Sequence, residues 1–121
     1  MGPYLGQPNK EKDSENGDGD YCAYGATSMQ GWRKSQEDAH IAHFLDDGVS
    51  LFGVFDGHGG KEVSILVKDK FAEMIQKLES YKSKQYDKAL KEVFYEMDKF
   101  LESDEGNEAL KKIQEDHSSP D

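Results

Sequence analysis

Apolar and polar positions along the chain first indicate three short strands. Residues 21–28 are rich in aromatic and small side chains, and residues 39–45 alternate moderately between apolar and polar. Both patterns are typical of β-strands, and so is the nearly continuous apolar run of residues 49–55. Such a run favours burial on both faces of a sheet, so we expect the third strand to be an interior one. Asp47-Gly48 suits a tight hairpin turn, which predicts antiparallel pairing of the second and third strands.

The hydrophobic period then changes to that of helices. Apolar residues recur every three or four positions over residues 60–80, which predicts an amphipathic helix. A second helix is predicted over residues 86–103, with Asp87 near its start and Lys99 near its end, as the helix dipole favours. A weak third helix is predicted over residues 108–115, where apolar positions are few.

Polar segments flank this patterned region. Residues 1–20 cannot bury enough apolar surface to order themselves, which predicts a flexible acidic tail. Their Asp, Asn and Gly spacing does not fit a calcium-binding EF-hand loop. Residues 105–121 are predicted to form a weak helix and a frayed tail. Residues 21–104, between these segments, are assigned to one folded domain.

The order of elements predicts an α+β fold with about three strands followed by two or three helices. Helices on one face of such a sheet leave its other face and at least one edge without a partner. An interior third strand needs neighbours that this chain scarcely supplies. We therefore expect that further sequence is missing.

Composition narrows the classes of function. The formal net charge of −10 and the absence of Lys/Arg clusters disfavour nucleic-acid binding. The acidic residues serve solubility, or a few of them form a carboxylate-rich site for hard cations. The composition does not decide between these two interpretations. No apolar run approaches the length of a membrane span. Cys22 is the only cysteine, so no internal disulfide forms and a cytoplasmic or nuclear location is expected.

The first two residues of the chain match part of a lipid-attachment motif. Met1-Gly2 would allow N-myristoylation of Gly2, which would associate the protein with membranes. Gly6 stands where the usual pattern has Ser or Thr, so the motif is incomplete.

One candidate site follows the third strand, at Asp56-Gly57-His58-Gly59-Gly60. A buried strand delivers Asp56 at its end, and glycines allow the backbone to turn sharply and expose carbonyl groups. Carboxylate and carbonyl oxygens are the ligands of Mg²⁺ and Mn²⁺. His58 could act as a general acid near neutral pH. The alternative is a glycine-rich turn in which Asp56 caps the following helix.

A second candidate constellation precedes the second strand. Arg33 offers a planar fork that suits a phosphate group. Glu37 and Asp38 are adjacent carboxylates, and neighbouring positions point to opposite faces of an extended chain, so they are expected to play different roles. The alternative is an exposed charged loop.

Taken together, the two constellations resemble the opening motifs of the protein phosphatase 2C family. Gly-Trp-Arg ending at Arg33 is followed by Glu-Asp-Ala-His from Glu37 to His40, then by an apolar strand closed at Asp56 by Asp-Gly-His-Gly-Gly. The resemblance covers residues 21–80 well and residues 81–104 only as generic helices. It implies that residues 21–104 are the N-terminal part of a catalytic domain built as an α/β/β/α sandwich of antiparallel sheets.

The resemblance also implies roles for individual residues. Asp56 would bridge two Mn²⁺ or Mg²⁺ ions, and Gly57 would supply a backbone carbonyl. Glu37 and Asp38 would bind metal directly or hold its waters. The substrate phosphate of a phosphorylated protein would be bound by Arg33. His58 would protonate the leaving Ser or Thr oxygen, and a metal-bridging water would be the nucleophile.

One departure limits the expected activity. The family carries further Asp ligands downstream, in segments that residues 81–121 do not match. The leading hypothesis is therefore a truncated form of a metal-dependent protein serine/threonine phosphatase, inactive by itself. A second hypothesis is a non-catalytic fragment that acts through interaction or weak metal or phosphate binding. A third is an unrelated cation-binding module with Asp56 at its only site.

Overall fold

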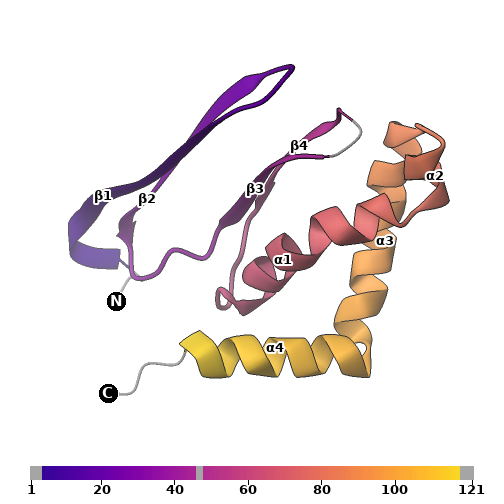
Figure 1. Cartoon of the computed structure of the whole chain (residues 1–121). Helices are drawn as coiled ribbons and strands as arrows, with labels where there is room; N and C mark the ends of the chain where they lie inside the picture. Colours follow the sequence, from indigo (N-terminus) through magenta and orange to yellow (C-terminus); the bar gives the residue numbers. More distant parts are fainter. Residues whose placement is uncertain (1–3, 46–47, 118–121) are drawn as a thin grey trace.

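The computed structural model describes residues 4–45 and 48–117, in which two antiparallel sheets precede a set of helices (Figure 1). Each sheet has two strands, β1 with β2 and β3 with β4. The predicted α+β class is confirmed, with four strands in place of about three. The strands are β1 (Tyr4–Asp18), β2 (Ala23–Arg33), β3 (Ala39–Phe44) and β4 (Ser50–Phe55).

Strand β1 corrects the prediction of a flexible tail over residues 1–20. Tyr4–Asp18 pairs antiparallel with β2, in a register that sets Ser14 opposite Thr27. The hydroxyls of these two residues lie 2.8 Å apart. The prediction was wrong for this segment because a strand can be held by backbone hydrogen bonds and polar cross-strand pairs, which need no apolar side chains. Gly2, the candidate myristoylation site, lies outside the described residues.

Strands β3 and β4 form the predicted antiparallel pair. Their register runs from Ala39 opposite Phe55 to Phe44 opposite Ser50. Gly48 has a φ of +82°, and its amide donates to the Leu45 carbonyl at 3.2 Å. Asp47 of the predicted turn, with Asp46 before it, lies outside the described residues.

Strand β4 is buried on one face only, which corrects the prediction of an interior strand. Leu51 and Phe55 pack against the core, whereas Phe52 and Val54 are exposed, Val54 by 74%. The helices cover a single face of the two-stranded β3–β4 sheet, so alternate side chains of β4 point away from the helical layer.

The helical part begins after β4 and follows the predicted periods closely. The first predicted helix divides into two because Leu78 is extended, with φ −74° and ψ 139°. The weak third helix is longer than predicted, because the Ser103 hydroxyl accepts the Gly106 amide and caps it. The helices are α1 (Glu62–Gln76), α2 (Glu79–Lys82), α3 (Tyr86–Glu102) and α4 (Asp104–His117).

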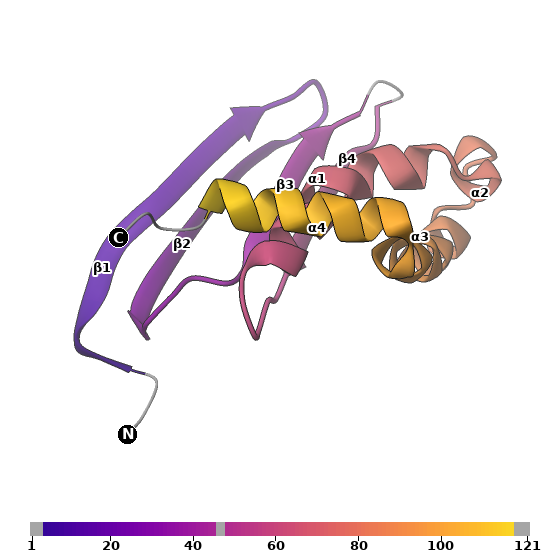
Figure 2. The same ribbon diagram turned by 90° about the horizontal axis from the view of Figure 1, so that it is seen from below.

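The core lies between α1, α3 and the β3–β4 sheet. Helix α1 packs on β3 and β4, α3 packs on α1, and α4 runs across both helices (Figures 1 and 2). No helix within residues 4–45 and 48–117 is long and apolar enough to cross a membrane. The buried core residues are Ile41, Phe71, Ile75, Tyr81, Ala89, Val93 and Met97.

The β1–β2 hairpin lies on the other side of the β3–β4 sheet from α1 (Figure 1). The Tyr24 ring of β2 meets the rings of Phe44 and Phe52 edge-on, with centroids 5.7 and 5.6 Å apart. The Glu15 carboxylate of β1 contacts the His40 ring of β3. Hydrogen bonds from His40 and then Tyr24 hold the pKa of Glu15 below its ordinary value. These side chains join the hairpin to the β3–β4 sheet.

Val93→Ala should lower the free energy of unfolding by about 2 kcal/mol, since it deletes two fully buried methyl groups from the core. Urea unfolding followed by circular dichroism measures the change. Val54→Ala is the matched control, because the same deletion at a side chain 74% exposed should cost about 0.5 kcal/mol or less. Equal costs at the two positions would show that the core is misplaced.

Candidate functional site

The site is built around the turn between β4 and α1. Strand β4 ends at Phe55, so Asp56 stands at the strand end, as predicted, and α1 begins at Glu62. Gly60 has a φ of +123°, a backbone conformation that side chains with a Cβ rarely adopt. The turn can therefore reverse direction within a few residues.

The residue packed against this turn is Glu37, in the segment that joins β2 to β3. A Cβ added to Gly57 would lie 2.2 Å from the Glu37 carbonyl oxygen, so only glycine fits there. The Ser64 hydroxyl, on the first turn of α1, donates to the same carbonyl oxygen at 2.6 Å. Two parts of the chain that lie up to 27 residues apart are thus in direct contact.

The Glu37 side chain is also held. Its Oε2 accepts the Ser35 hydroxyl at 2.7 Å, and its Oε1 accepts the Gly60 amide at 3.1 Å. These hydrogen bonds, Ser35 first and then Gly60, hold the pKa of Glu37 below its ordinary value against partial desolvation. The charges of Arg33 and His58 act in the same direction. Glu37 therefore stays ionised at neutral pH, and Arg33 and His58, the predicted phosphate ligand and the predicted acid, both contribute to this.

Asp56 and His58 line a hollow of about 430 Å³ at the end of the sheet. Gly57 and Gly60 also line it, and apolar side chains of α1 and α3 form its far wall. Asp56 and His58 are both exposed. The predicted metal ligand and the predicted acid thus share one open cavity.

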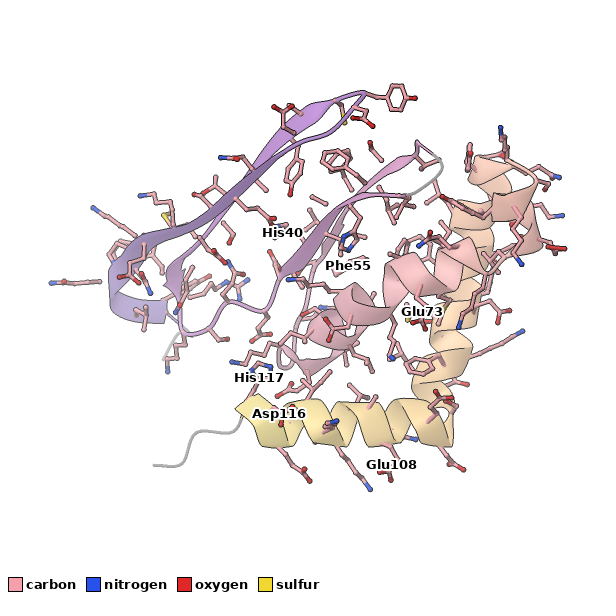
Figure 3. The ribbon with its side chains drawn as sticks, in the orientation of Figure 1. His40, Phe55, Glu73, Glu108, Asp116 and His117 are labelled. Carbon is pink, nitrogen blue, oxygen red and sulfur yellow. The ribbon has the colours of Figure 1, made fainter. Side chains whose placement is uncertain are left out.

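Asp38 lines a different hollow, of about 680 Å³, between β2 and the β3–β4 sheet. His40 lines the same hollow, and Figure 3 shows it on the side of β3 that faces the hairpin. The adjacent carboxylates Glu37 and Asp38 therefore lie in different surroundings, as their alternation along an extended chain predicts. The structure does not bring Asp38 into the hollow that Asp56 lines.

The donor set does not make a metal centre by itself. Within the described ranges, no group of three or more His, Cys, Asp or Glu side chains is arranged to hold a metal ion. Glu37, Asp38 and Asp56 are predicted ligands, but they are not gathered into such a group. The residues present in this part of the chain do not, on their own, fit a resident metal ion.

Sequence reasoning missed two residues that hold the site together. Ser35 belongs to the constellation for which an exposed charged loop is the alternative, and Ser64 is one polar position in an amphipathic helix pattern. Both hydroxyls hydrogen-bond to Glu37. A signal existed only for Ser64, which falls at a position of the helix that faces the protein rather than the solvent.

Gly57→Ala should destabilise the chain by about 1–3 kcal/mol, because the new methyl group would collide with the Glu37 carbonyl. Gly25→Ala is the matched control, since a Cβ there meets nothing within 4 Å. Urea unfolding of both variants measures the difference. An unaltered stability for Gly57→Ala would contradict the contact between the turn and Glu37.

Comparison with known proteins identifies related sequences. The family model of protein phosphatase 2C matches residues 22–118. Probable protein phosphatase 2C 6 of Paramecium tetraurelia is 48% identical over 114 residues, which are 93% of this chain and 39% of that protein. Probable protein phosphatase 2C 21 of Arabidopsis thaliana is 42% identical over 107 residues, 88% of this chain and 30% of that protein.

The chain thus spans about two fifths or less of the length of these relatives. The match covers both constellations and the helices that follow, so the hypothesis of an unrelated cation-binding module is wrong. The chain belongs to the protein phosphatase 2C family.

Proposed function

We propose that the protein is a metal-dependent protein serine/threonine phosphatase and that this chain supplies part of its active site. The observation that carries the proposal is the placement of Glu37. Its carboxylate accepts a hydrogen bond from the Gly60 amide, and the charges of Arg33 and His58 contribute to lowering its pKa. Family membership and the names of the relatives give the class of reaction. Phosphorylated proteins are the proposed substrates, and neither nucleic acid nor a membrane span enters the proposal.

In the proposed reaction, water attacks the phosphorus of a phosphoserine or phosphothreonine, and the bond to the side-chain oxygen breaks. Arg33 binds the phosphate oxygens through its guanidinium fork, and its exposure at the end of β2 leaves it accessible. His58 donates a proton to the departing oxygen. Its place in the open hollow with Asp56 gives it access to a substrate.

Dependence on Mg²⁺ or Mn²⁺ is part of the proposal and comes from the family. Asp56, Gly57, Glu37 and Asp38 are the residues of this chain proposed to take part in holding the ions. Because the described residues form no metal-holding group, the geometry supports no step at a metal ion.

For the 121-residue chain alone we propose little or no phosphatase activity. Two closely spaced divalent cations need several carboxylates around them, and residues 4–45 and 48–117 do not gather them into one group. The same observation favours the second candidate for the chain by itself, a non-catalytic module that binds phosphate or metal weakly. A cytoplasmic or nuclear location, and membrane association through a lipid on Gly2, remain proposals as well.

A chimera tests the proposal directly. The 114 residues of Paramecium phosphatase 2C 6 that match this chain are replaced by the chain itself, and phosphate release from a phosphothreonine peptide is measured in Mn²⁺. The chimera should be active, and Asp56→Asn should lower kcat by about 100-fold, because Asn keeps the shape of Asp without its charge.

Asp69→Asn, on the exposed surface of α1, is the matched control and should leave kcat unchanged. The unmodified relative provides the reference rate. A folded but inactive chimera beside an active relative would contradict the proposed function. Turnover by residues 1–121 alone, lost on Asp56→Asn, would contradict the proposed inactivity of the isolated chain.

A further inference from the structure

Ser64 is a buried serine whose hydroxyl reaches outside its own helix. Its side chain is only 4% exposed, and a buried hydroxyl needs a hydrogen-bond partner. Helix serines commonly satisfy this need by donating to a carbonyl three or four residues earlier. Ser64 has that option in the Lys61 carbonyl at 3.0 Å, but the Glu37 carbonyl lies closer, at 2.6 Å. The single hydroxyl proton therefore favours Glu37, 27 residues away in the sequence.

A second buried serine shows that burial alone does not produce such a contact. Ser80 in α2 is 5% exposed, and its hydroxyl has no hydrogen-bond partner among the described residues. Ser64 and Ser80 are thus similar in burial and differ in what their hydroxyls do. This makes Ser80 a natural reference for any effect of removing a buried hydroxyl.

The contact acts on a segment that lies outside the strand ladders. Residues 34–38 join β2 to β3 and belong to neither strand, so no ladder fixes Glu37. Its carbonyl is held between Gly57 and Ser64, and its carboxylate reaches the Gly60 amide. Holding the carbonyl fixes where the Cα lies and so where the side chain starts. Without the Ser64 hydroxyl, the carboxylate would lose its fixed distance to Gly60.

We propose that Ser64 is a positioning residue: its hydroxyl fastens the backbone of Glu37 to the start of α1 and so aims the Glu37 carboxylate at the Gly57–Gly60 turn. The positioning itself is a property of the chain. Its consequence for phosphate hydrolysis rests on the proposed function, because the position of Glu37 affects a reaction only if the protein is a phosphatase.

Amide hydrogen exchange, measured by NMR on the 121-residue chain, tests the positioning without any activity. Ser64→Ala should speed exchange of the Gly60 amide about tenfold, because a lost hydrogen bond loosens the Glu37 carboxylate that protects it. Ser80→Ala should leave Gly60 exchange unchanged. Ser64→Thr, which keeps the hydroxyl, should restore the slow exchange. Unchanged Gly60 exchange in Ser64→Ala would overturn the proposal.

Alanine favours helices, so Ser64→Ala is expected to fold. If it does not, Ser64→Thr and Ser64→Val form a second pair that differs only in hydroxyl against methyl. Slow Gly60 exchange in the Thr variant and fast exchange in the Val variant would support the proposal. Equal exchange in the two would overturn it.

The Paramecium chimera tests the catalytic consequence separately. Ser64→Ala should lower kcat about tenfold with KM within about twofold, since Arg33 still binds the phosphate. Ser80→Ala should change neither constant. An inactive chimera whose Gly60 exchange still responds to Ser64→Ala would refute the proposed function and keep the positioning role. An active chimera whose kcat is unchanged by Ser64→Ala would refute the catalytic consequence.

Discussion

The contact between Glu37 and the turn after β4 is the constraint on which the site depends. The Glu37 carbonyl lies so close to Gly57 that a single added carbon would collide with it. The Ser64 hydroxyl then donates to the backbone carbonyl of Glu37, and the Gly60 amide donates to its side-chain carboxylate. The turn and the start of α1 therefore determine where Glu37 lies within the segment between β2 and β3.

The helical layer gives this turn a rigid base. Helix α1 starts directly after the glycines and packs on β3 and β4 through Phe71 and Ile75. Figure 3 shows Phe55, the last residue of β4, on the helical side of the sheet. The centroids of the Phe55 and Phe71 rings lie 5.3 Å apart. The burial that holds α1 in place thus also holds the strand end that carries Asp56. The opposite face of the sheet meets the β1–β2 hairpin through Tyr24 instead of a helical layer, and Phe52 and Val54 remain exposed there.

How much the sequence could predict depended on whether the determining interaction was local. The strand end at Asp56 and helix α3 follow from hydrophobic period and from glycines, which act on near neighbours. Strand β1 was not predicted, because its order comes from backbone pairing with β2 and the polar segment has no apolar pattern of its own. The role of Ser64 could not be predicted because its partner lies 27 residues away. The sequence predicted that Asp38 and Glu37 would differ in role, but it did not predict the hollow that Asp38 lines.

The central claim is that this chain alone already brings its two motifs together at Glu37. The most direct measurement is the nuclear Overhauser effect between the Gly60 amide proton and the Glu37 Hγ protons, in metal-free residues 1–121. The account predicts a clear cross-peak, since the Gly60 nitrogen and Glu37 Oε1 lie 3.1 Å apart. A folded chain without that cross-peak, with the Gly60 amide exchanging as fast as in an unstructured peptide, would contradict it.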